Sequence, residues 1–247
     1  MPPQQQELAD TLTTSAIPAS APRRPPALET GDHLTRPEFE RRYEAMPEVK
    51  KAELIEGVVY MPSPVRMQNH GNPQAALIGW LVAYWASTPG IRVGDNATLR
   101  LDVDNEPQPD AVMYVEPIFG GQARIDDEGY LVGGPELVAE VAASTVSIAR
   151  NSKMRVYRRN SIREYIIWRV EDRALDWYVL RDGQYELLER TADGLLRSEQ
   201  FPGLWLDPEA LLRFDVARVL RVLQQGLAGA EHAAFVAKLQ QRAGRQS

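Results

Sequence analysis

The sequence of 247 residues contains no cysteine. This absence excludes disulfide bonds, zinc sites built on thiolates, iron–sulfur clusters and thiol catalysis. Histidine is also scarce, because only His33, His70 and His232 are present and they lie far apart in the chain. A zinc site rich in histidine is therefore not expected. Any metal held by this chain would depend on carboxylates, which suit hard ions such as Mg²⁺ or Mn²⁺.

Long apolar runs are absent as well, since no stretch approaches the roughly 18 apolar residues of a membrane-spanning helix. The first residues do not have the basic start and apolar core of a signal peptide. We therefore expect a cytoplasmic protein with no membrane partner. Residues 1–30 are rich in Pro, Ala, Gln, Ser and Thr without any sustained period. This composition predicts a disordered N-terminal tail.

The formal net charge is −6, which argues against a non-specific nucleic-acid coat protein because such proteins are usually basic. The charge is unevenly distributed along the chain. Residues 102–140 contain ten acids and one base, whereas residues 150–173 contain eight bases and three acids. The simpler interpretation is two solvated faces of opposite sign. The alternative is a metal site beside a surface that faces phosphates.

The hydrophobic pattern predicts an α/β domain with a mixed central sheet flanked by helices. A capping box of Thr35 and Glu38 predicts a helix to about Ala45. Residues 52–61 read as a hairpin that turns at Gly57, residues 69–87 as a buried helix and residues 117–134 as a loop. The remaining predicted strands are 97–103, 109–116, 135–143, 163–170, 174–180 and 184–190, and the remaining predicted helices are 146–160, a segment opened by Asp207 and Pro208, and 230–242. We assign residues 31–212 to the domain and residues 213–247 to a C-terminal helical extension.

Two carboxylates are not easily explained as surface residues. Glu140 lies in the apolar run LVAEVA, and glutamate is rarely buried unless it is paired or bound to metal. Asp110 follows Pro109 at the start of another apolar strand. If these strands are neighbours, the two carboxylates repel one another unless a cation, usually a divalent metal, lies between them. The alternatives are a buried salt bridge from Glu140 to an arginine of the following helix, and a turn-capping role for Asp110.

Four further residues are candidates for the same site. Lys153 follows the Glu140 strand on the predicted helix and could orient a water molecule or stabilise charge on a phosphate. Tyr157 is four residues further on and is more consistent with packing than with reaction. Glu53, at the start of the first hairpin, is either a further metal ligand or a structural anchor. For His70 we favour a structural role.

These residues occur in a recognisable order. The segments are AELIEGVVYMPSP followed by His70, then QPDAVMYV, GPELVAEVAAST, SKMRVYRRNSIREYIIWRV and FPGLWLD, and they span roughly residues 34–212. This order resembles the PD-(D/E)XK nuclease superfamily and, more narrowly, the bacterial Uma-two family of restriction-endonuclease-like proteins. The resemblance implies a restriction-endonuclease-like core. It also implies a metal site at Asp110, Glu140 and Glu53.

The resemblance implies that the catalytic residues are Asp110, Glu140 and Lys153. The usual lysine position, two residues after the glutamate, is Ala142 here, and the lysine of this family matches Lys153 on the following helix. A second departure is Ala149, where relatives usually carry an aspartate. The implied function is endonuclease cleavage of DNA with Mg²⁺ or Mn²⁺ by a homodimer. The alternatives are a catalytically inactive module of this fold that binds nucleic acid or a protein partner, and a structural dimer without nucleic acid.

The basic residues Arg155, Arg158 and Arg159 of the predicted helix could contact flanking phosphates. We do not expect all three to share one face of the helix. Any nucleic-acid binding should be weak and strongly dependent on salt, because only a local basic patch is available on a protein whose net charge is negative.

Overall fold

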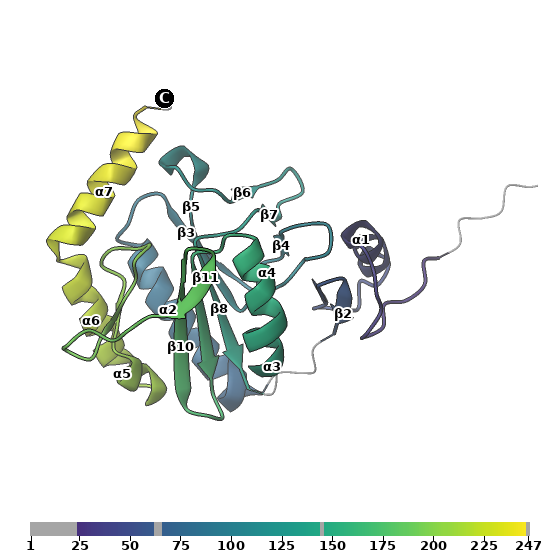
Figure 1. Ribbon diagram of the computed structural model, residues 1–247, viewed down its shortest axis with the longest axis horizontal. Helices are drawn as coiled ribbons and strands as arrows, with labels where there is room; N and C mark the ends of the chain where they lie inside the picture. The colour runs from purple at the N-terminus through teal and green to yellow at the C-terminus, as the bar shows by residue number, and fades with distance from the viewer. Residues whose placement is uncertain (1–23, 62–65, 144–145, 246–247) are drawn as a thin grey trace, which may run out of the picture.

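The computed structural model describes residues 24–61, 66–143 and 146–245 (Figure 1). Its centre is a six-stranded sheet with the strand order β11-β10-β9-β8-β5-β3. The strands are β3 (Ile91–Asp95), β5 (Ala111–Val115), β8 (Leu137–Ala142), β9 (Glu164–Arg169), β10 (Ala174–Arg181) and β11 (Gln184–Leu187). Only the β8–β9 pair is parallel within this sheet, and the other neighbours are antiparallel. The predicted α/β fold with a mixed central sheet is therefore confirmed.

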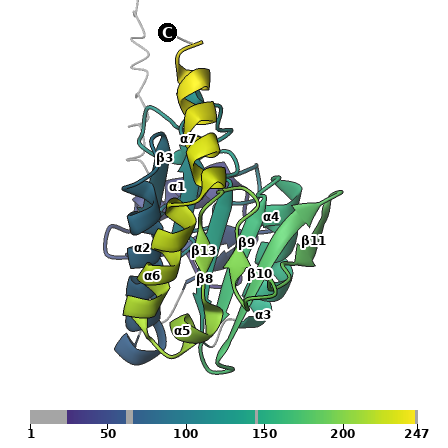
Figure 2. The same cartoon turned by 90° about the vertical axis from the view of Figure 1, so that its left-hand side faces the viewer.

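Helices cover both faces of the sheet (Figures 1 and 2). One face carries α2 (Asn72–Trp85), α5 (Pro208–Leu212), α6 (Val216–Leu227) and α7 (Ala230–Ala243). The other face carries the crossover between the parallel strands β8 and β9. This crossover consists of α3 (Val146–Ile148), a π-helical turn (Ala149–Lys153) and α4 (Met154–Arg159). Two parallel neighbouring strands need a long crossover connection, which explains why a helix follows the Glu140 strand as predicted.

The C-terminal helices that we expected as an extension contribute to the main hydrophobic core. Val219 and Leu223 of α6 and Leu239 of α7 are buried in the same cluster as Trp80 of α2 and Trp177 of β10. The spacing of four residues between Val219 and Leu223 places both side chains on one side of α6. Within the described residues, no helix combines the length and apolar character needed to cross a bilayer.

The alternation of side chains along β8 decides which face carries the candidate site. Leu137, Ala139 and Val141 point into the core under α2, and the intervening residues point toward α4. Ala111 of β5 is paired with Ala139 of β8 in antiparallel register. Continuing this register by one residue places Asp110 opposite Glu140. Because residues directly opposite in a sheet share a face, both carboxylates point toward the helical crossover.

A small N-terminal layer packs beside this face. It contains α1 (Arg36–Glu44) and the hairpin of β1 (Glu53–Ile55) and β2 (Val58–Tyr60). The hairpin joins the rest of the fold through the backbone of Leu54, which donates to and accepts from the backbone of Glu106 over 3.1 and 2.8 Å. Leu28 is 3% exposed and packs in the core of this layer, while residues 1–23 of the predicted tail lie outside the described part of the chain.

The local structure differs from the sequence predictions in several places. Thr35 is the N-cap residue of α1, but its side chain makes no capping bond, and Arg41 and Arg42 bind the Glu38 carboxylate instead. The segment after α2 was given no predicted strand, whereas β3 forms there and pairs with β5. β3 is short, is mostly not buried and contains Gly94. An edge strand of this kind needs only one partner, so its sequence carries little strand signal.

The alternating segment 97–103 does not form the predicted strand next to β5. It contributes only β4 (Leu99–Arg100), which pairs with β7 (Leu131–Val132), and β7 pairs with β6 (Arg124–Ile125) in the region expected as a loop. Three further short elements are η2 (Pro117–Phe119), β12 (Leu196–Arg197) and β13 (Trp205–Leu206). The alternation of Leu99 and Leu101 therefore reflects burial of the side chains more than extended sheet pairing.

Candidate active site

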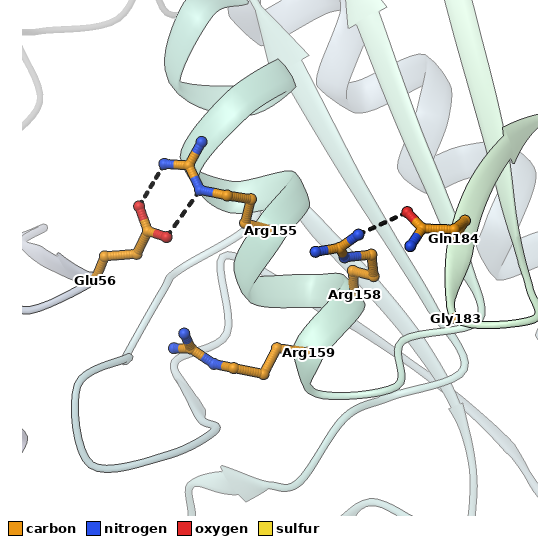
Figure 3. A pocket seen from close by; sticks show the side chains of 6 residues that line it. All are labelled: Glu56, Arg155, Arg158, Arg159, Gly183 and Gln184. Carbon is orange, nitrogen blue, oxygen red and sulfur yellow. Dashed lines mark hydrogen bonds and ion pairs between the residues drawn. The ribbon is translucent and has the colours of Figure 1, made fainter.

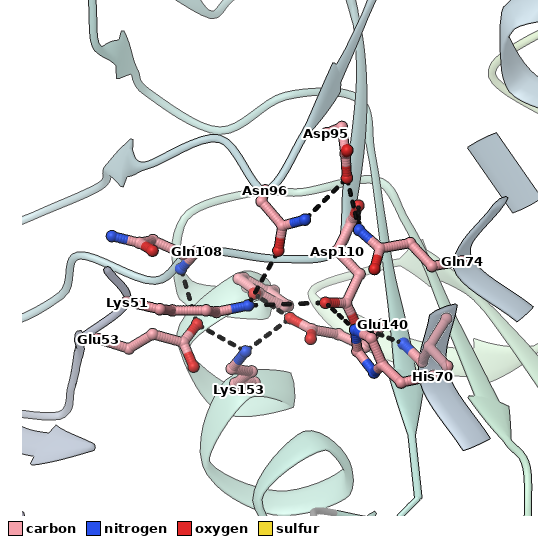
Figure 4. Close-up of polar contacts among 12 residues, drawn as sticks. Lys51, Glu53, His70, Gln74, Asp95, Asn96, Gln108, Asp110, Glu140 and Lys153 are labelled. Carbon is pink, nitrogen blue, oxygen red and sulfur yellow. Dashed lines mark hydrogen bonds and ion pairs between the residues drawn. The ribbon is translucent and has the colours of Figure 1, made fainter. Parts of the chain in front are cut away.

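A buried cluster of charged side chains lies between the sheet, the crossover helix and the β1–β2 hairpin (Figure 4). Asp110 precedes β5 and is 2% exposed, and Glu140 of β8 is 6% exposed. Lys153 at the end of the π-helical turn is 5% exposed, and Glu53 at the start of β1 is 7% exposed. The structure therefore brings together the four residues that the sequence singled out, from segments up to 100 positions apart.

Lys153 connects two of these carboxylates. Its Nζ donates to Oε1 of Glu140 and to Oε1 of Glu53, each over 2.8 Å. The hydroxyl of Tyr157, one turn further along the crossover helix, donates to the same Oε1 of Glu140 over 2.9 Å. The cation that a buried Glu140 requires is therefore supplied within the chain, by a lysine and not by the arginine of our alternative. Burial of Glu140 alone does not demand a metal.

Asp110 is held differently. Its Oδ2 accepts the backbone N–H of Val141 over 2.7 Å, which ties the start of β5 to β8. Its Oδ1 faces two cationic or titratable groups, Nε2 of His70 at 3.2 Å and Nζ of Lys51 at 3.6 Å. One oxygen therefore fixes the carboxylate and the other points into the charged cluster.

The surroundings shift the pKa values in opposite directions at the two central carboxylates. Burial raises the pKa of Glu140, with smaller contributions from the charges of Asp110 and Glu53 in the same direction, and Lys153 opposes the rise. Burial also acts to raise the pKa of Asp110, but the hydrogen bond from His70 and the charge of Lys51 outweigh it, so this pKa is lowered. Two neighbouring carboxylates with separated pKa values are a feature of sites that handle protons.

The surroundings favour the charged forms of Lys153 and His70. Burial lowers the pKa of Lys153, but the charges of Glu140 and Glu53 outweigh this effect and raise the pKa above its ordinary value. The hydrogen bond to Asp110 raises the pKa of His70. Lys153 is thus an ammonium at neutral pH, able to stabilise negative charge but unable to accept a proton.

Glu53 does not have the surroundings expected of a third metal ligand. Its Oε1 accepts from Lys153 and also from the backbone N–H of Gln108, over 2.7 Å. Throughout the ranges that the structure describes, no group of three or more His, Cys, Asp or Glu side chains is arranged to hold a metal ion. The metal-ligand role that the resemblance implied for Glu53 stays a prediction, and the contacts that the structure gives Glu53 are with Lys153 and Gln108.

The remaining pair, Asp110 and Glu140, still fits a hard divalent cation. Both residues offer carboxylate oxygens on one face of the sheet, opposite each other in register. Mg²⁺ is commonly bound by one or two carboxylates, with water and substrate phosphate oxygens completing its shell. A pair is therefore sufficient for this ion, although it would not suffice for a structural zinc or calcium site.

The structure adds two residues that sequence reasoning missed or undervalued. Lys51 was not considered, although it lies two positions before Glu53, the spacing at which an extended chain places side chains on one side. His70, for which we favoured a structural role, lies against Asp110 from the π-helical turn (Met67–Gly71) that precedes α2. Ala149, the position of an aspartate in the resembling family, is 3% exposed and packs in the core.

Comparison with known proteins identifies the family and supports the fold. The family model Uma2, described as "Putative restriction endonuclease", matches residues 36–209. Among solved structures, the chain is similar to a protein from Anabaena variabilis that is described as a "putative nuclease belonging to DUF820". The TM-score is 0.51 at 14% identity, over 69% of this chain and 97% of that one, which supports the shared fold. No curated protein matches the chain.

Proposed function

Because the chain belongs to the Uma2 family of restriction-endonuclease-like proteins, we propose that it is a metal-dependent endonuclease that hydrolyses phosphodiester bonds in DNA. The observation that carries the proposal is the placement of Asp110 opposite Glu140, with Lys153 bound to Glu140. Two carboxylates and a lysine on one side of a mixed sheet form the functional pattern of the PD-(D/E)XK superfamily. The choice of DNA rests on family analogy.

Each residue has a proposed role in this reaction. Asp110 and Glu140 would hold Mg²⁺ or Mn²⁺, which supplies an activated water and neutralises charge on the phosphate. Lys153 would stabilise the negative charge that develops on the phosphoryl oxygens. In such a hydrolysis the water oxygen would bond to phosphorus as the bond to the leaving oxygen breaks. The water would lose one proton to solvent, and the leaving oxygen would take up one proton.

Tyr157 and Glu53 would act through other residues in the cluster. Each makes a hydrogen bond that holds Glu140 or Lys153 in place, over 2.9 and 2.8 Å. His70, whose pKa is raised by its hydrogen bond to Asp110, contacts this carboxylate from a partly exposed position. It is therefore a second candidate, after solvent, to donate the proton to the leaving oxygen.

A catalytically inactive module that binds nucleic acid or a protein partner is the second candidate function. The observation that favours it is the pairing of Glu140 with Lys153, which satisfies the buried charge without a metal. Ala149 favours it as well, since this chain places no carboxylate at that position.

The deciding experiment is cleavage of plasmid DNA and labelled oligonucleotides by the purified protein with Mg²⁺ or Mn²⁺. We expect cleavage that is abolished by EDTA and by Glu140→Gln, with the variant still folded by circular dichroism. We also expect Mg²⁺ to raise the Tm of the wild type by mass action, and not that of the Glu140→Gln variant. A protein that cuts no DNA with either metal would overturn the endonuclease proposal and leave the inactive module.

We further propose that the protein is a homodimer, since nucleases of this fold often pair to reach both strands and two-fold dimers are the commonest oligomers. Trp205 packs against residues of its own chain. Its backbone oxygen accepts from Trp80 Nε1 over 3.0 Å, and the Arg197 guanidinium lies 3.9 Å from its ring centroid. Light scattering that gives the mass of one chain at micromolar concentration would contradict the dimer.

A further inference from the structure

A basic hollow lies on the outer side of the same crossover helix (Figure 3). Its volume is about 410 Å³, and it is lined by Glu56, Arg155, Arg158, Arg159, Gly183 and Gln184. Three elements form it, namely α4, the tip of the β1–β2 hairpin and the turn between β10 and β11. We name it the arginine hollow.

All three arginines line one hollow, contrary to our expectation that they could not share a face. Their spacing explains this outcome, because positions i, i+3 and i+4 of an α-helix lie on the same side. Arg155, Arg158 and Arg159 have this spacing within α4. Lys153 is two positions before Arg155 and therefore points to another side, toward the buried cluster.

The present partners of these arginines can be exchanged for a ligand. Arg155 binds Glu56 through two hydrogen bonds of 2.9 and 2.6 Å, and its side chain is 53% exposed. Arg159 lies 3.2 Å from Asp102 and is 54% exposed. Ion pairs at such exposure contribute little in water, so a phosphate oxygen competes with the carboxylate at small cost.

Arg158 differs from its two neighbours because its partner is neutral. Its guanidinium donates to Oε1 of Gln184 over 2.6 Å. A guanidinium fork binds phosphate through two parallel hydrogen bonds, which an amide oxygen does not match. At Gly183, in the turn that also lines the hollow, no described atom beyond the two neighbouring residues lies within 4 Å of the position that a Cβ would take. This wall therefore leaves space for a ligand.

The hollow and the buried cluster are two sides of one junction. The hairpin and the crossover helix are linked on the inside by Glu53 and Lys153 and on the outside by Glu56 and Arg155. We infer that the arginine hollow binds backbone phosphates of the nucleic acid that flank the phosphate cleaved at the cluster. The inference rests on the proposed function for the identity of the ligand, and on the hollow itself for its charge and shape.

The test is binding of a labelled DNA duplex in EDTA, where no metal-dependent cleavage occurs, measured at several salt concentrations. Arg158→Gln with Arg159→Gln should weaken binding about 10-fold and reduce the slope of log K against log salt by about 2. The matched control is Arg190→Gln with Arg213→Gln, two exposed arginines that both lie beside Glu209. The control should keep the affinity and slope of the wild type.

A second variant separates charge from folding. Arg158→Lys with Arg159→Lys keeps both charges and should retain the salt slope, and all variants should have the Tm of the wild type within a few degrees. Equal losses in the test and control pairs, an unchanged salt slope, or no DNA binding at about 50 mM salt would overturn the inference. Binding of anionic vesicles but not DNA through these arginines would overturn it as well.

The cleavage assay distinguishes failure of the inference from failure of the proposed function. If the wild type cuts DNA with Mg²⁺ while the test pair binds and cuts like the control pair, the hollow is not the phosphate site and the endonuclease stands. If the wild type cuts nothing but its DNA binding depends on Arg158 and Arg159, the endonuclease fails and the phosphate site stands.

Discussion

Two glutamates on the neighbouring parallel strands β8 and β9 are buried, but they have opposite surroundings. Glu140 is 6% exposed and Glu164 is fully buried. In the register of the two strands, Glu140 is paired with Ile167, whereas Glu164 is paired with Leu137 at the other end of the pair. The two carboxylates are therefore offset along the strand pair, and because side chains alternate they point to opposite faces of the sheet.

Glu164 is bound by neutral donors from a single loop. The hydroxyl of Ser198 lies 2.9 and 2.8 Å from its two oxygens, and the backbone N–H groups of Glu199 and Gln200 donate to Oε1 over 2.7 and 3.0 Å. Burial nevertheless raises its pKa to about 7. This arrangement anchors the loop after β12 to the start of β9.

Glu140 shares its burial and its raised pKa with Glu164, but its neighbours are charged and come from separate elements. Lys153 belongs to the crossover, Glu53 to the hairpin, and Asp110 precedes β5. Burial and a shifted pKa alone therefore do not identify an active site in this protein. Convergence of unlike charges from several elements on one point distinguishes Glu140 from Glu164, and such convergence is costly for stability, which makes this cluster the candidate site.

The largest expected effect separates the two glutamates by activity. Glu140→Gln should lower cleavage by about 10² to 10³-fold, because a neutral amide is a poor partner for both Lys153 and a metal. Glu164→Gln should leave kcat within a few-fold of the wild type at temperatures well below its Tm. Single-turnover cleavage of a labelled duplex measures both. Equal losses in the two variants would remove the functional distinction.

The second prediction removes the cation that Glu140 and Glu53 share. Lys153→Met should cost about 3–5 kcal/mol of unfolding free energy, because two carboxylates are left buried without their partner. Urea unfolding followed by tryptophan fluorescence gives the value. In the double variant Lys153→Met with Glu140→Gln the loss should be smaller, and a larger loss would show that Lys153 stabilises the fold by packing alone.

A smaller loss of unfolding free energy is expected at Glu164, whose hydrogen-bond donors are neutral. Glu164→Gln replaces an oxygen that accepts hydrogen bonds with an NH₂ group, so one or two loop donors lose their partner. The cost should be about 1–3 kcal/mol in the same urea experiment. Ser198→Ala, which removes one donor only, serves as the milder comparison. A Glu164→Gln protein as stable as the wild type would contradict the anchoring role.

The fourth prediction concerns pH. Because the pKa of Glu164 is raised from 4.5 to about 7 in the folded state, the folded protein binds more protons than the unfolded chain between these values. Its contribution to stability is complete below pH 4.5 and is lost as the pH rises through about 7. The free energy of unfolding should therefore fall less steeply with pH over this window in Glu164→Gln than in the wild type. Identical slopes would contradict the raised pKa.

The smallest effect is expected at the exposed bridge between Glu56 and Arg155, the outer counterpart of the Glu53–Lys153 bridge. Glu56→Gln should leave the Tm within about 1 °C of the wild type, since exposed ion pairs contribute little and are screened by salt. Scanning calorimetry at low and high salt measures this difference. A loss comparable with that of Lys153→Met would show that the outer bridge, and not the inner one, holds the hairpin in place.

Several features of the site could be predicted from local sequence patterns. The run LVAEVA identified β8 and the unusual position of Glu140, and the segment after Pro109 identified β5 and Asp110. The following basic segment identified the crossover helix with Lys153. These predictions succeeded because a strand that is buried on both faces of the sheet has apolar residues at nearly every position. A single carboxylate within such a strand is therefore conspicuous.

The amino-acid sequence by itself determined the hydrophobic period, the burial and the order of β5, β8 and the crossover helix. These properties depend on the spacing of side chains along one segment, which is local. Only the tertiary structure decided that Lys51 and His70 reach Asp110, that Glu53 binds Lys153, and that β3 pairs with β5. These contacts join segments far apart in the chain, and they depend on strand register and on the path of the crossover. These contacts are selected by attraction between opposite charges that are buried together and by hydrogen bonds between the backbones of neighbouring strands. Both interactions join residues of separate segments, so no single segment encodes them.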